Sequence, residues 1–179
     1  MARFDPEAIR QRSWRRYERA IKRRKDDRAA EAAWFQDQQS ILDLCQLTNW
    51  CASKSLSVEF KRIPNGIFDR NSSSIAIASN AKPLRQVAYL LHECGHYLGS
   101  LISDEDDRFK MGYPLGEGFT SERGFVHKLA CIEEEFEAWH RGWKLACRLD
   151  LNIRREQFDD VRRDCLKSYI QWGNRRSTS

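Results

Sequence analysis

The feature that most constrains this chain is a pair of histidines four residues apart, His92 and His96, with a glutamate, Glu93, directly after the first. Apolar residues recur at steps of three and four through residues 84–101, which predicts an amphipathic helix. Positions four apart on a helix project from one face, so both imidazoles can reach one ion. To complete a site for such an ion, the fold has to bring a further ligand of the ion to this face of the helix.

These three residues form the HExxH pattern of zinc hydrolases. In such a site two neutral imidazoles hold Zn²⁺, which acidifies a water, and the glutamate takes the proton as that water attacks a carbonyl. Glu93 can then return the proton to the leaving amine. A pattern of five residues also arises by chance, but the chain has only four histidines and two fall at this spacing. The sequence therefore predicts a zinc cofactor on His92 and His96, with Glu93 as the catalytic base.

A catalytic zinc usually has three protein ligands, so a third has to come from elsewhere in the chain. The best source is the helix predicted at 125–149, because it contains four glutamates. Glu137 is the first choice, since Ala138 follows it and Gly142 lies one turn beyond Ala138. Small residues at these places would let this helix approach the HExxH helix closely.

Glu134 is the alternative third ligand, because it is in line with the same small residues. Glu133 and Glu135 are expected to flank an apolar stripe, and a solvated face is the ordinary place for most of these carboxylates. The stripe consists of Leu129, Ile132, Phe136, Trp139 and Trp143. His127 and Tyr113 are candidates for polarising a substrate carbonyl or stabilising an oxyanion, although a lone histidine near a helix start is more often a cap or a surface group.

The remaining periodicity predicts a mainly helical α+β fold. Apolar residues alternate with polar ones between residues 57 and 79, and turn residues separate them, which predicts a small antiparallel three-stranded sheet. The polar, glycine-rich stretch at 103–124 is expected to be a long surface loop. Helices are expected at 6–39, 41–55, 84–101, 125–149 and 154–172.

The N-terminal part of the chain is strongly basic. Residues 1–30 hold eleven Lys or Arg and five Asp or Glu, whereas the whole chain carries a net charge of +5, so the rest is close to neutral. The arginines are interleaved with Trp14 and Tyr17, and this combination can neutralise phosphates and stack on bases. Residues 3–28 are therefore a candidate surface for nucleic acid or for an acidic protein, unless the helix is simply a solvated one.

Nothing in the chain predicts contact with a membrane. No stretch approaches the roughly 20 apolar residues of a membrane span, and the N-terminus lacks the apolar segment of a secretory signal. A cytoplasmic location is expected.

A strand, a helix with HExxH and a later helix with Glu137-Ala138 and a nearby aromatic residue together resemble the gluzincin-type zincin metallopeptidases. The chain looks in particular like the small ImmA/IrrE-type proteins of bacteria and phages, over residues 74–98 and 132–146. That family often has Asn or Asp after the Glu-Ala pair, and this chain has Trp139. The resemblance implies a zincin-like fold, a zinc cofactor and cleavage of a protein or peptide substrate, often a regulator.

This interpretation divides the chain into a basic helical arm at 1–35, a zincin-like metallopeptidase domain at 36–173 and a polar tail at 174–179. Two alternatives remain open at this point. One is a catalytically silent zincin-like protein that binds nucleic acid or a regulatory protein through its basic helix. The other is a metal hydrolase that acts on a bond other than a peptide bond, because the same activated water attacks amides and esters.

Overall fold

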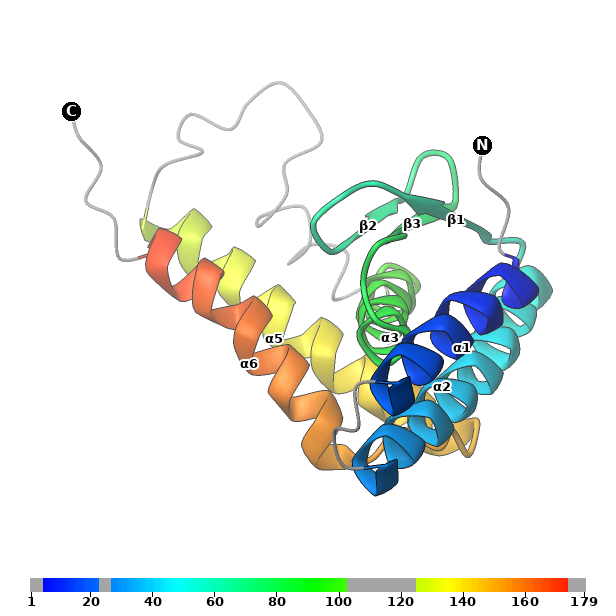
Figure 1. The fold of residues 1–179 in the computed structure, drawn as a ribbon. Coiled ribbons are helices and arrows are strands. Elements are labelled where there is room, and N and C mark those ends of the chain that lie inside the picture. The colour runs from blue at the N-terminus through cyan, green and yellow to red at the C-terminus, as the bar shows by residue number, and fades with distance from the viewer. Residues whose placement is uncertain (1–4, 23–26, 103–124, 174–179) are drawn as a thin grey trace.

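The computed structural model describes residues 5–22, 27–102 and 125–173, and within these ranges the fold is mainly helical with one small sheet. The α+β class is therefore confirmed. The helices are α1 Pro6–Lys22, α2 Asp27–Ser53, α3 Pro83–Gly99, α5 Phe125–Arg148 and α6 Arg155–Gly173, and the strands are β1 Ser57–Lys61, β2 Gly66–Asp69 and β3 Ser74–Ala78 (Figure 1). None of the described helices is long and apolar enough to cross a membrane. The loop expected at 103–124 lies outside the described residues.

Helix α3 is the central element of the fold, and it packs against α2, α5 and the sheet (Figure 1). Every side chain from Gln86 to His96 is buried, because apolar residues continue round the helix rather than along one stripe. Pro83 lies in the first turn, where its missing N–H is not needed for the helix. The helix that carries HExxH is thus a core element, and its prediction at 84–101 is confirmed.

The sheet is mixed, which corrects the antiparallel sheet expected from the sequence. β3 lies in the middle, parallel to β1 and antiparallel to β2, so the strand order is β1-β3-β2. Ile75 and Ile77 of β3 are fully buried, whereas Ile67 of β2 is 56% exposed. The most apolar strand takes the place that is paired on both sides and covered by helices. As a consequence, β2 is an edge strand, and it lies beside α3.

Helices α1 and α2 lie side by side (Figure 1) and are joined mainly by aromatic rings. The ring centres of Trp14 and Tyr17 lie 6.1 and 5.7 Å from that of Trp34. One ion pair joins the two helices as well, between Arg16 and Asp37 at 2.9 Å. The long polar side chains of α1 remain largely in solvent around these contacts.

This helix pair corrects the single helix expected at 6–39. The sequence between α1 and α2 contains no Gly or Pro, but burying aromatic rings between two helices stabilises the molecule more than one long solvated helix would. The helix expected at 41–55 is the second half of α2. Helix α2 therefore runs across the expected boundary between 35 and 36.

Helices α3 and α5 cross with their backbones in direct contact. A Cβ atom on Gly95 would lie 1.9 Å from the carbonyl oxygen of Ala138, and one on Gly142 would lie 2.5 Å from the carbonyl oxygen of Leu91. Both positions therefore need glycine. Ala138 and Gly142 bring α5 against the HExxH helix as the sequence predicted, and this contact decides which face of α5 meets α3.

Candidate metal centre

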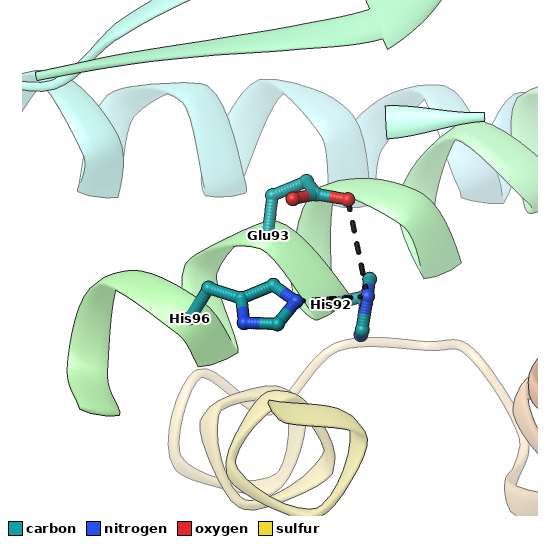
Figure 2. Close-up of side chains that lie close together, drawn as sticks. All are labelled: His92, Glu93 and His96. Atoms are coloured by element: carbon teal, nitrogen blue, oxygen red, sulfur yellow. Dashed lines mark hydrogen bonds and ion pairs between the residues drawn. The ribbon is translucent and has the colours of Figure 1, made fainter. Parts of the chain in front are cut away.

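His92, Glu93 and His96 lie in adjacent turns of α3 and form a buried group (Figure 2). Their ligand atoms lie within 4.8 Å of one another. The two Nε2 atoms are 3.2 Å apart, and His92 Nε2 lies 4.0 Å from Glu93 Oε1. A buried His-Glu-His group with this geometry can hold a metal ion.

A second carboxylate, Glu135 of α5, faces both imidazoles. Its Oε2 lies 3.1 Å from His92 Nε2, and its Oε1 lies 3.5 Å from His96 Nε2. The sequence put Glu137 in this place, with Glu134 as the alternative, and the structure corrects both. Glu137 is exposed, and Glu134 is buried but faces the other ring nitrogen of His96.

The correction follows from helix geometry at the crossing point. Ala138 touches α3, and residues three or four positions away share its face of α5. Glu135 is three residues before Ala138, whereas Glu137 is its direct neighbour and is turned away by about 100°. The small residue was therefore the right marker for the contact, but the carboxylate that faces both imidazoles lies beside it on the helix surface and not next to it in the chain.

The spacing of the donor atoms fits a zinc ion. Tetrahedral zinc with bonds of about 2.0–2.1 Å places neighbouring donor atoms about 3.4 Å apart. The Nε2 atoms of His92 and His96 are 3.2 Å apart, and the carboxylate of Glu135 places Oε2 3.1 Å from the first and Oε1 3.5 Å from the second. The distance from His92 Nε2 to Glu93 Oε1 is longer, at 4.0 Å. These three residues therefore have the spacing of ligands, while Glu93 lies beside them.

The electrostatics of the cluster favour a positive charge among these groups. Burial lowers the pKa of His96, but hydrogen bonds with Glu134 and Glu135 outweigh burial and raise this pKa to about 10. Burial raises the pKa of Glu135, but hydrogen bonds with His92 and His96 hold it well below its usual range. Both shifts arise because carboxylates and imidazoles face each other away from water. A divalent cation bound among these groups would supply the positive charge that the carboxylates favour.

A chain of hydrogen bonds fixes the orientation of His96. Its Nδ1 lies 3.1 Å from Glu134 Oε1, and Arg141 donates to the same oxygen at 2.8 Å. Arg141 also donates through Nε to the carbonyl oxygen of Gly95 at 2.9 Å. A carboxylate on Nδ1 fixes the tautomer of a metal-binding histidine and directs Nε2 to the metal. Glu134 therefore orients His96 and closes the contact between α5 and α3.

His92 has no carboxylate on Nδ1, and its ring is held by stacking. Its ring lies 4.4 Å from the ring of Trp139, at an interplanar angle of 20°. Its Nδ1 has no hydrogen-bond partner among the residues that the structure describes. Trp139 in turn packs edge to face on Phe158 of α6, with ring centres 5.2 Å apart. The tryptophan after the Glu-Ala pair thus fixes the first histidine from α5.

Glu93 is positioned by β2, the edge strand of the sheet. The backbone N–H of Phe68 donates to its carboxylate. A Cβ atom on Gly66 would lie 2.6 Å from Glu93 Oε1, so the absence of a side chain at this position makes room for the carboxylate. Burial raises the pKa of Glu93 although the two histidines oppose the shift. A carboxylate with a raised pKa accepts a proton more readily, as a general base must.

Tyr169 of α6 lies at the site, although nothing in the sequence predicts it there. Its hydroxyl donates a hydrogen bond to Glu135, and burial together with that carboxylate raises the pKa of Tyr169 far above its usual range. In the sequence Tyr169 continues an apolar stripe of its helix and is indistinguishable from a core residue. Of the two other candidates, Tyr113 and the side chain of His127 lie outside the described residues.

Comparisons of the chain with protein-family models, with curated proteins and with solved structures find no match. The resemblance to gluzincins and to ImmA/IrrE-type proteins therefore stays a prediction from the sequence.

Proposed function

We propose that this protein is a zinc-dependent hydrolase that cleaves a peptide bond in a protein substrate. His92, His96 and Glu135 would hold the ion, and Glu93 would act as the base. The observation that carries the proposal is the spacing of the three donor groups, 3.1 to 3.5 Å, with Glu93 at 4.0 Å beside them. Three protein ligands and one open position are the arrangement of catalytic zinc.

The residues divide the work of hydrolysis in a simple way. A bound zinc ion would polarise the substrate carbonyl and acidify a water. Glu93 takes the proton from the water on its carboxylate and passes it to the nitrogen of the leaving amine. The Phe68 N–H and the space over Gly66 keep the carboxylate in place for both transfers.

The buried Glu93 favours an enzyme over a catalytically silent scaffold. Burying a carboxylate costs free energy, and this one lies outside the ligand spacing of the other three groups. A purely structural metal site gains nothing from it, whereas a hydrolase needs it. The choice of a peptide bond rests on the HExxH pattern and on the resemblance to metallopeptidases.

The test compares the zinc-loaded chain with its Glu93→Gln variant on denatured, fluorescently labelled casein and on a library of quenched peptides. Glutamine keeps the size of the side chain but cannot take a proton. We expect unchanged zinc content and a loss of cleavage of at least about a hundredfold. Equal cleavage by both proteins, or no cleavage of any peptide by the zinc-loaded wild type, would contradict the proposal.

A further inference from the structure

A cleft of about 290 Å³ lies between α1 and the segment that leads from β3 into α3. One wall is built by four arginines of α1 that share a helix face, and we call the site the arginine cleft: Arg12, Arg15, Arg16 and Arg19. The facing wall is formed by Ser79, Asn80, Ala81, Pro83 and Gln86. None of these residues belongs to the candidate metal centre.

The charge of the arginine cleft is only partly balanced by the protein. Arg16 pairs with Asp37 at 2.9 Å. Within the described part of the chain, Arg12, Arg15 and Arg19 have no carboxylate partner, and Arg12 and Arg19 donate only through Nε to carbonyl oxygens of their own helix. Like charges three and four residues apart repel one another on a helix. An anion placed among them removes this repulsion.

The facing wall adds a second source of positive potential. Helix α3 begins there, with Lys82 as its N-cap and Pro83 in its first turn, and the Lys82 side chain makes no capping hydrogen bond. The N-terminal end of a helix carries a partial positive charge and attracts phosphate groups. The arginines and this helix end therefore act on the same space from two sides.

Gln86 gives an independent sign of a ligand in this cleft. It lines the cleft, its side chain is 2% exposed, and its Nε2 donates to the carbonyl oxygen of Ala78 at 2.9 Å. That bond fixes the amide, and the remaining atom, Oε1, has no hydrogen-bond partner within residues 5–22, 27–102 and 125–173. A buried hydrogen-bond acceptor without a donor costs free energy of folding. The missing donor is a hydroxyl or amino group, such as the sugar or base of a nucleotide carries and sulfate does not.

We propose that the arginine cleft binds a nucleotide, with its phosphate among Arg12, Arg15 and Arg19 and a sugar or base donor directed to Gln86 Oε1. The volume is close to the lower limit of small-molecule sites, about 300 Å³, which suits one phosphate and the group attached to it. The nucleotide is either free or part of a single strand.

The experiment titrates the full chain with uridine monophosphate, with a short labelled oligothymidylate and with sulfate, at low salt. The variants are Arg12→Gln and Arg19→Gln. The matched control is Arg10→Gln, which removes the same charge from the same helix but does not line the cleft. We expect each cleft variant to weaken nucleotide binding about tenfold, as for a lost charge-assisted hydrogen bond, and the control to change it less than about twofold.

A second variant, Gln86→Leu, separates a nucleotide site from a simple anion site. It should weaken the binding of the nucleotide and leave unchanged the binding of sulfate, an anion that has no hydrogen to donate. Binding of the mononucleotide identifies a free nucleotide as the ligand, and binding of the oligonucleotide alone identifies a strand. Equal losses in Arg10→Gln and in the cleft variants, sulfate binding as tightly as either nucleotide probe, or no binding of any probe would overturn the proposal. Because the metal centre is not involved, a failure of the proposed hydrolase leaves these results unaffected.

Discussion

Two pairs of helices in this molecule, α3 with α5 and α1 with α2, pack by opposite means. In the first pair, glycines bring the backbones together, and charged groups are buried and bonded to one another between the helices. In the second pair, aromatic rings pack between the helices, and the arginine side chains lie at the surface. The first kind of contact fixes donor atoms to within a few tenths of an ångström, as a metal site requires. The second presents charge to solvent, where the position of each group matters less.

The largest effect is expected at the crossing of the first pair. In Gly95→Ala the new Cβ would meet the Ala138 carbonyl oxygen at 1.9 Å, so the two backbones have to separate. We expect the free energy of unfolding to fall by about 3 kcal/mol, even though alanine gains about 1 kcal/mol in helix propensity. Gly99→Ala on the same helix is the comparison variant: its Cβ would meet the Arg141 guanidinium at 2.6 Å, a side chain and not backbone, so a smaller loss is expected even though the bonds of Arg141 to Glu134 and Gly95 are disturbed. Urea denaturation measures both, and equal stability of the two variants would show that the crossing is not tight.

The position of the base gives the next effect. Gly66→Ala places a methyl group 2.6 Å from Glu93 Oε1, so the carboxylate has to move while the ligands stay in place. A displacement of about 1 Å of a catalytic group costs about a hundredfold in rate, and we expect this loss in kcat with unchanged zinc content. Asn65→Ala, at the exposed neighbouring position, should keep full activity. Loss of zinc from the Gly66 variant would mean that β2 supports the metal and not the base.

The hydrogen-bond chain behind His96 should show a smaller effect on metal affinity. Glu134→Ala removes the carboxylate from Nδ1 and leaves Arg141 without that partner. We expect zinc affinity to fall about ten- to a hundredfold, as for other groups that orient a ligand. Competition with a chromogenic chelator measures the change. A zinc affinity equal to that of the wild type would show that Glu134 does not orient His96 for metal binding.

The smallest effect is expected in the second helix pair. Asp37→Asn breaks the ion pair with Arg16, whose side chain is 41% exposed. Such a partly exposed pair contributes less than about 1 kcal/mol to the free energy of unfolding, and the zinc affinity should stay the same. Chemical denaturation and the chelator assay check both statements. A loss of zinc in this variant would show that the two helix pairs are coupled and do not act independently.

The two halves of the candidate metal centre differ in how far the sequence predicts them. His92, Glu93 and His96 lie within one helix, so the period of that helix alone decides that they share a region of space. Glu135 depends on the rotation of α5 against α3, which the tertiary contact at Gly95 sets. The small residues Ala138 and Gly142 mark the contact in the sequence, but they do not tell which of the neighbouring glutamates meets the histidines.

Apolar periodicity was misleading in α5 for a physical reason. The buried face of this helix includes three charged residues, Glu134, Glu135 and Arg141, which are stable there only because they bond to one another and to the histidines. The apolar stripe expected to be core includes Leu129 and Phe136, which are 44% and 42% exposed. A buried cluster of bonded charges thus places polar residues inside and apolar residues outside, the opposite of the pattern from which a core is normally predicted.

The most direct test of the central claim is the zinc content of three purified proteins, the wild type, Glu135→Ala and Glu137→Ala, after loading with zinc and removal of the unbound ion. The two variants remove the same group from the same helix, one facing the imidazoles and one facing solvent. We predict about one zinc per chain in the wild type and in Glu137→Ala, and loss of the metal in Glu135→Ala. Zinc retained in Glu135→Ala but lost in Glu137→Ala, or no zinc in the wild type, would contradict the site described for this protein.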